Sequence, residues 1–122
     1  MEFVKLIASH SGRYSYSGGS NIAMDILGSF LASDVYHPSS YIEFAFNDCE
    51  ECTSSNITAL EKENGYILLT DLYSEEKIPT VLKMTQNQFV QILTDWEKIL
   101  KLKPKEVIIK HENDQFVIET KD

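Results

Sequence analysis

The clearest potential for chemistry in this chain lies in two cysteines three positions apart. Cys49 and Cys52 lie in residues 48–52, Asp-Cys-Glu-Glu-Cys. A structural zinc site needs four ligands, usually a second pair at similar spacing. The chain has no third cysteine, and its histidines are scattered: His10, His37 and His111. Because the neighbouring acids oppose thiolate formation, a redox role is disfavoured. We expect two reduced thiols and no metal, and the alternative is a small metal-binding or enzymatic domain using these cysteines and a histidine.

Other catalytic constellations are missing from the sequence. The stretch Ser-Gly-Gly-Ser-Asn at residues 17–21 precedes a predicted helix and could hold an anion, but it lacks the Gly-Lys-Ser/Thr ending of a P-loop. There is no Gly-x-Ser-x-Gly elbow and no His-Glu-x-x-His. Paired carboxylates occur only in polar segments, where they ionise normally and make poor general acids. We expect no enzymatic activity and no cofactor.

The charge of the chain is unevenly distributed. The net charge is −8, and residues 34–76 carry ten acids against Lys62 alone, a net of −9. Nucleic-acid affinity depends on lysine and arginine contacts to phosphate, so we expect no nucleic-acid partner and no anionic membrane surface. A basic protein partner suits this surface, unless the acids serve solubility alone. The candidate contacts are Asp48, Glu50, Glu51, Glu61, Glu63, Asp71, Glu75 and Glu76, with Tyr14 and Tyr16 as aromatic anchors.

Hydrophobic periodicity in the first half predicts strands around one helix. Residues 3–8 read as a strand, and the glycine-containing stretch 9–20 reads as a long loop. An amphipathic stripe predicts a helix over about 20–33, capped by Ser20 or Asn21. Alternation of Ile42, Phe44 and Phe46 predicts a strand over 41–46. A polar loop is then expected over 48–56.

The second half carries the stronger signals. Asn64-Gly65 between residues 57–62 and 66–72 predicts a hairpin with a type I′ turn. An acidic turn over 74–79 and a short strand over 80–84 follow. Thr85 and Gln88 form a capping-box pattern ahead of an amphipathic helix over about 86–101. Residues 106–111 and 115–120 then predict a second hairpin.

This order of elements favours hairpins over βαβ crossovers. It predicts a single globular α+β domain over residues 1–122, with an antiparallel or mixed sheet and two main helices packed on it. No apolar run approaches the ~18 residues of a membrane span. The N-terminus lacks the basic and apolar regions of a signal peptide, so we expect a cytoplasmic protein with reduced thiols.

The last third of the chain resembles a known type of protein. The residues that carry the resemblance are Lys83-Met84-Thr85, the apolar positions of the predicted 86–101 helix, and Lys103-Pro104-Lys105 followed by the strand from Glu106. This part of the chain looks like the tail of small bacterial immunity proteins of polymorphic and contact-dependent growth-inhibition toxin systems. The resemblance implies a non-enzymatic protein that binds and neutralises a cognate toxin domain, in many cases a nuclease with a basic cleft. The alternative is a general interaction or adaptor module, homodimeric in one version, with no toxin partner.

Overall fold

The computed structural model describes residues 2–10, 13–46, 52–54 and 57–122, and these form an α+β fold. Strands and helices follow one another along the chain as β1 (Glu2–Ala8), β2 (Tyr14–Gly19), α1 (Ile22–Asp34), α2 (Pro38–Phe46), β3 (Cys52–Ser54), β4 (Thr58–Glu63), β5 (Tyr66–Asp71), β6 (Val81–Thr85), α3 (Gln86–Leu102), β7 (Glu106–Glu112) and β8 (Gln115–Lys121). The α+β class predicted from the sequence is therefore confirmed.

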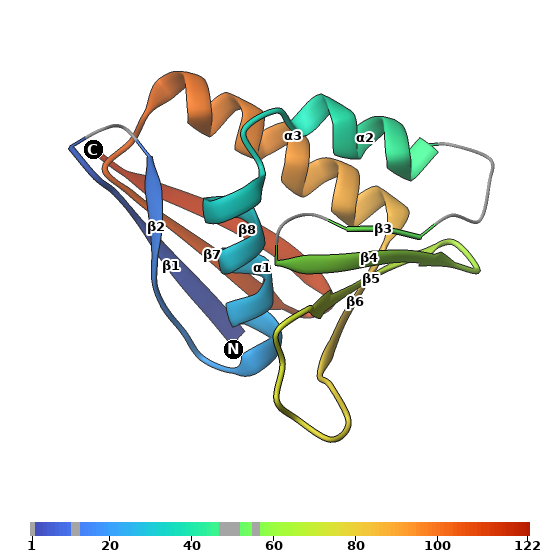
Figure 1. Ribbon diagram of the computed structural model, residues 1–122. Helices are drawn as coiled ribbons and strands as arrows, with labels where there is room; N and C mark the ends of the chain where they lie inside the picture. The colour runs from blue at the N-terminus through green and yellow to red at the C-terminus, as the bar shows by residue number, and fades with distance from the viewer. Residues whose placement is uncertain (1, 11–12, 47–51, 55–56) are drawn as a thin grey trace.

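The strands form two antiparallel sheets where the sequence suggested one. The first sheet has the order β2-β1-β7-β8 and joins the two ends of the chain, and the second has the order β3-β4-β5-β6. Helix α1 lies between the two sheets, while α2 and α3 pack against each other at the top of the molecule in Figure 1. One buried apolar cluster links both sheets with these helices, and Trp96, Phe30 and Phe89 are its largest fully buried members.

Local signals fix the two predicted helices and the two predicted hairpins. Thr85 caps α3 in a capping box with Gln88, and Asn21 caps α1 by accepting a hydrogen bond from the Met24 N–H at 2.9 Å. Both turns place two successive residues at positive φ, as type I′ turns require: Asn64 and Gly65 (49° and 84°), and Asn113 and Asp114 (52° and 60°).

The predicted strand over residues 41–46 is wrong, because these residues belong to helix α2. Pro38 occupies the first position of α2, where its fixed φ suits a helix and its missing N–H costs nothing. Pro38 and Ala45 are buried, and the Tyr41 ring meets Phe30 edge-on at 5.1 Å. Helix packing onto α1 and α3 therefore overrides the alternating pattern.

The predicted long loop over residues 9–20 is also wrong in its second half. Tyr14–Gly19 forms the edge strand β2, which pairs with β1 through a register shift between Lys5 and Leu6. A short strand, β3, likewise lies within the predicted 48–56 loop. Both strands are formed by pairing with a stronger neighbour, a long-range contact that local composition does not reveal.

Candidate partner-binding site

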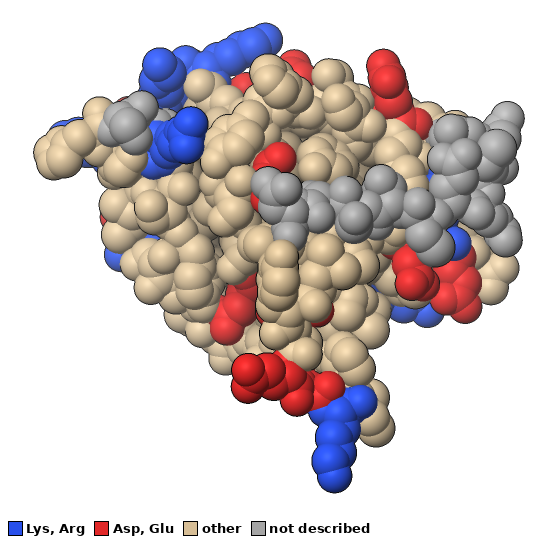
Figure 2. Space-filling model, viewed as in Figure 1, with Lys and Arg blue, Asp and Glu red and all other residues tan. Residues whose placement is uncertain are grey.

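The loop between β5 and β6 carries two of the three most exposed large apolar side chains among the described residues. This segment, residues 72–80, is called the 72–80 loop, and it projects from one end of the second sheet (Figure 1). Tyr73 is 72% exposed, and Ile78, at 87%, is the most exposed large apolar side chain among the described residues. Figure 2 shows acidic side chains gathered on the same projection, with a basic side chain extending from its tip. Exposed apolar groups rimmed by charge are typical of protein-interaction surfaces.

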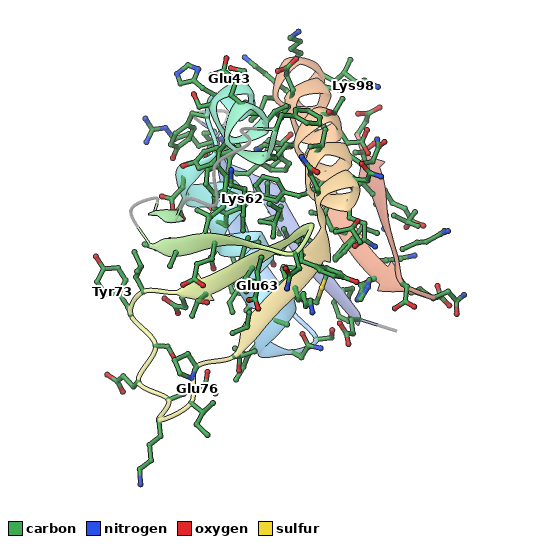
Figure 3. The ribbon with its side chains drawn as sticks, turned by 90° about the vertical axis from the view of Figure 1, so that its right-hand side faces the viewer. Glu43, Lys62, Glu63, Tyr73, Glu76 and Lys98 are labelled. Carbon is green, nitrogen blue, oxygen red and sulfur yellow. The ribbon has the colours of Figure 1, made fainter. Side chains whose placement is uncertain are left out.

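Hydrogen bonds within the 72–80 loop hold it in a defined conformation. The Glu76 carboxylate accepts bonds from the Thr80 N–H at 3.4 Å and from the Thr80 hydroxyl at 3.2 Å. The Ser74 hydroxyl accepts from the Glu76 N–H at 3.2 Å, and the Asp71 carboxylate accepts from the Tyr73 N–H at 2.9 Å. Glu76 and Asp71 therefore position the loop as well as charging it, and Figure 3 shows Glu76 and Tyr73 on the loop. A preformed loop loses less conformational entropy when it binds a partner.

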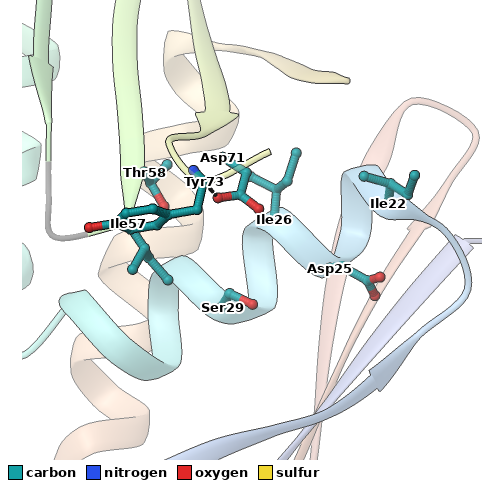
Figure 4. Close-up of a pocket in the computed structure, with 8 residues that line it drawn as sticks. All are labelled: Ile22, Asp25, Ile26, Ser29, Ile57, Thr58, Asp71 and Tyr73. Carbon is teal, nitrogen blue, oxygen red and sulfur yellow. Dashed lines mark hydrogen bonds between the residues drawn. The ribbon is translucent and has the colours of Figure 1, made fainter. Parts of the chain in front are cut away.

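A pocket of about 360 Å³ lies beside the base of this loop. One wall is a single face of α1, whose lining residues are three or four positions apart in the sequence. The other wall is made by the start of β4 and the end of β5 (Figure 4). Its lining comprises Ile22, Asp25, Ile26, Ser29, Ile57, Thr58, Asp71 and Tyr73. Two carboxylates at the rim of a largely apolar pocket suit an apolar side chain that carries a cationic end, such as lysine or arginine.

The Tyr16 ring connects the first sheet to this pocket. Its hydroxyl donates a hydrogen bond to the Asp25 carboxylate, and Asp25 lines the pocket. Burial raises the pKa of Tyr16 above its ordinary value, and the hydrogen bond and negative charge of Asp25 raise it further. The phenol therefore stays protonated and keeps Asp25 oriented.

The structure brings together only some of the predicted acids. Asp71, Glu75 and Glu76 lie at the base of the 72–80 loop or on it, next to the pocket. Glu61 and Glu63 are exposed on the second sheet, and Glu63 pairs with Tyr66 at the opposite end of β5 from Asp71. Glu61 and Glu63 are therefore separate from the loop. The remaining three predicted acids, Asp48, Glu50 and Glu51, lie outside the described residues.

Tyr14 requires a correction, because it lies in the core and is not available as a surface anchor. Its side chain is 5% exposed, its hydroxyl donates to the Pro104 carbonyl at 2.5 Å, and its ring lies 5.2 Å from that of Trp96. Burial raises its pKa. Tyr16, 39% exposed beside the pocket, remains the candidate of the two.

Sequence reasoning missed the apolar part of the site and Asp25. Tyr73 and Ile78 flank an acidic turn, and large apolar residues in a polar turn are themselves a signal that could have been used. Asp25 could be found only from the packing of α1 against the end of β5. Among the described residues, no group of three or more histidine, cysteine or acidic side chains is arranged to hold a metal ion. Since Cys49 is not described, the zinc alternative stays a prediction.

Together the fold and these surfaces describe an α+β protein with an acidic, partly apolar candidate binding site. Comparisons with protein-family models, with curated proteins and with solved structures find no match to this chain. In the part of the chain that the structure describes, no helix combines the length and apolar character needed to cross a membrane.

Proposed function

We propose that this protein is a non-enzymatic, cytoplasmic immunity protein that binds and neutralises a cognate bacterial toxin. The observation that carries the proposal is the 72–80 loop, where Tyr73, Glu75 and Ile78 are exposed and where Tyr73 lines the pocket together with Asp71. Its partner is a basic toxin domain, and the class of toxin proposed is a nuclease. An acidic surface can occupy the cationic cleft that such an enzyme uses for phosphate, while apolar anchors slow dissociation.

Complementary charge and apolar anchoring make separable contributions to such a complex. Long-range attraction between an acidic and a basic surface mainly raises the association rate, and it weakens with salt. Burial of an aromatic or aliphatic anchor mainly lowers the dissociation rate. The proposal therefore predicts different kinetic effects for substitutions at Glu75 and at Ile78.

The test begins with the reading frame immediately upstream, which is expected to end in a toxin domain. Co-expression with this chain should protect cells, and surface plasmon resonance then measures association of the purified toxin domain. Glu75→Lys should slow association several-fold at low salt and less at high salt. Ile78→Ala and Tyr73→Ala should each raise the dissociation rate by about 10-fold.

Matched controls lie on the end of α3, away from the 72–80 loop. Leu102 is 80% exposed, so Leu102→Ala removes an equally exposed apolar side chain, and Glu97→Lys makes the same change of charge as Glu75→Lys on that helix. Both variants should bind as the unmodified protein does. Equal effects at the loop and at α3 would refute the site. A metabolic or regulatory gene upstream, with no toxin bound or neutralised, would refute the function and favour the adaptor alternative.

A further inference from the structure

The first sheet has one face that the described helices leave uncovered. Helix α1 contacts β1 and β2, and α3 contacts β8, while Val4 and Leu6 point into the core and are fully buried. Side chains alternate along a strand, so the intervening residues point to the opposite face. There, Phe3 is 39% exposed, Ile7 is 41% exposed and Val117 is 47% exposed.

Strand register arranges three apolar side chains of this face as a diagonal, with Phe3 to one side of it. The diagonal runs across three neighbouring strands through Ile7 of β1, Ile108 of β7 and Val117 of β8. Each of these residues is offset by two positions, along the strand direction, from the one on the neighbouring strand. These three residues are called the diagonal stripe. Neighbouring strands are about 4.8 Å apart and alternate residues on one strand about 6.7 Å apart, so successive residues of the stripe are diagonal neighbours, and an ion pair crosses between each two of them.

Charged side chains flank the diagonal stripe with opposite sign on its two sides. Lys5 and Lys110 lie on one side, and Glu106 and Glu119 lie on the other, where Lys121 also lies. Across the stripe, Lys5 pairs with Glu106 at 3.1 Å and Lys110 pairs with Glu119 at 3.0 Å. The face is therefore close to neutral in a chain whose net charge is −8.

We infer that this face binds a second copy of the same chain about a two-fold axis running along the diagonal stripe. Such an axis lays the stripe of one copy on the stripe of the other. It exchanges the two flanks, so that Lys5 of one copy lies opposite Glu106 of the second copy and Lys110 lies opposite Glu119. From the strand and residue spacings, the strands of the two sheets would cross at about 70°, close to the orthogonal class of sheet packing.

A second copy fits this face better than an acidic or basic partner does. The face complements itself in both charge and apolar pattern, which is the requirement for an interface between identical subunits. The described part of the segment of net charge −9, residues 34–76, contributes no strand to the first sheet, so two copies meet here away from most of the acids that the structure describes. The inference is independent of the proposed function, whose site lies at the second sheet and α1.

The size of the face sets the expected strength of the dimer. The exposed part of this sheet measures on the order of 400 Å² per copy from strand dimensions, or about 800 Å² for the pair. This is below the area of standard stable interfaces and falls in the range of weak, reversible association. We therefore expect a dimer that forms at high micromolar concentration and dissociates on dilution.

Sedimentation velocity between about 1 µM and about 500 µM tests the dimer directly. The weight-average mass should rise from 13.9 kDa towards twice that value as the concentration increases. Val117→Lys places a charge on the stripe and should weaken association at least ~10-fold. The control Leu102→Lys, at an 80% exposed position on α3, should leave it unchanged. A monomer at every concentration overturns the inference.

A charge-exchange experiment tests the two-fold geometry. Lys5→Glu and Glu106→Lys should each weaken self-association, because each variant places like charges opposite each other across the axis. An equimolar mixture of the two variants should dimerise again, because opposite charges then meet at both contacts. Circular dichroism of each variant alone establishes that it is folded.

The matched control uses the Glu97–Lys101 pair on α3, whose atoms lie 3.8 Å apart. Glu97→Lys and Lys101→Glu carry the same changes of charge on another surface, so neither should weaken the dimer and mixing them should add nothing. Single variants of the sheet face that dimerise like the unmodified protein would overturn the inference. A mixture of Lys5→Glu and Glu106→Lys that remains monomeric would overturn it as well.

Discussion

Replacing Tyr14 by phenylalanine should destabilise the protein measurably, although it removes one oxygen atom. The hydroxyl is buried and donates to the carbonyl of Pro104, a residue that is itself buried. Without this donor, the Pro104 carbonyl is an unsatisfied acceptor in an apolar setting next to Trp96. An unsatisfied buried acceptor lowers the free energy of unfolding by about 1–3 kcal/mol. We expect a loss of about 1.5 kcal/mol in the free energy of unfolding.

The expected change in melting temperature follows from the chain length. At about 2.1 cal/mol/K per residue, 122 residues give an unfolding entropy of about 0.26 kcal/mol/K, so the midpoint should fall by about 6 °C. Circular dichroism during heating and urea unfolding measure the two quantities. Both transitions should remain cooperative, since the ring still fills its place against Trp96.

Tyr16→Phe is the matched control, because it removes the same atom from an exposed position. The Tyr16 hydroxyl bonds Asp25 where solvent can replace it, so we expect a loss below about 0.5 kcal/mol. If Tyr16→Phe is as destabilising as Tyr14→Phe, or if neither has an effect, the assignment of Tyr14 to the core is refuted.

Two further predictions concern packing and pH. Gly28→Ala should lower the free energy of unfolding by about 1 kcal/mol, since the new Cβ would lie 2.4 Å from the Val4 side chain and overpacking outweighs the gain in helix propensity; a variant more stable in urea would contradict this. Folding raises the pKa of Tyr14 and Tyr16, so stability should fall as the pH rises above about 10, where the unfolded tyrosines release protons that the folded protein retains. Urea unfolding between about pH 8 and pH 11 measures the slope, and a Tyr14→Phe variant with an unchanged slope would contradict the assignment.

Elements with strong local signals were predictable from the sequence. The α3 helix begins where Thr85 and Gln88 place a capping box, and both two-residue turns contain residues that tolerate positive φ. These signals act within a few residues of the chain, so they do not depend on the rest of the fold. The α+β class follows from them, because hairpins and amphipathic helices leave few alternatives.

The segments that failed are those whose structure depends on distant partners. Residues 41–46 are too short for periodicity to distinguish a strand from a helical turn, and the local feature that favours a helix is Pro38 at its first position. Strand β2 contains two glycines and forms because β1 offers it a pairing edge. The prediction of Tyr14 as a surface anchor is wrong for the same reason. A residue in a loop is expected to be exposed, whereas an edge-strand residue that faces α3 is expected to be buried.

The charge of the candidate site was predictable from the sequence, whereas the arrangement of its residues in space was not. The acid excess of residues 34–76 could be counted from the sequence, but the fold decides which acids become neighbours. Asp71 is separated from Asp25 by 46 positions, yet both line one pocket because α1 packs beside the end of β5. Glu63 is closer to Asp71 in sequence and lies at the other end of the strand. Proximity in the sequence therefore does not predict which of these acids lie next to one another on the surface.

The distribution of charge along the chain becomes a distribution between two sheets. The near-neutral terminal segments build the first sheet, whereas the acidic middle supplies α2 and three strands of the second. A chain that binds a basic partner through its acids and also associates with itself must keep the two surfaces apart, because acids at the self-association face would repel each other. Pairing of the first strand with the C-terminal hairpin achieves this separation: β1 and β7 bring residues more than 100 positions apart, such as Glu2 and His111, into one sheet.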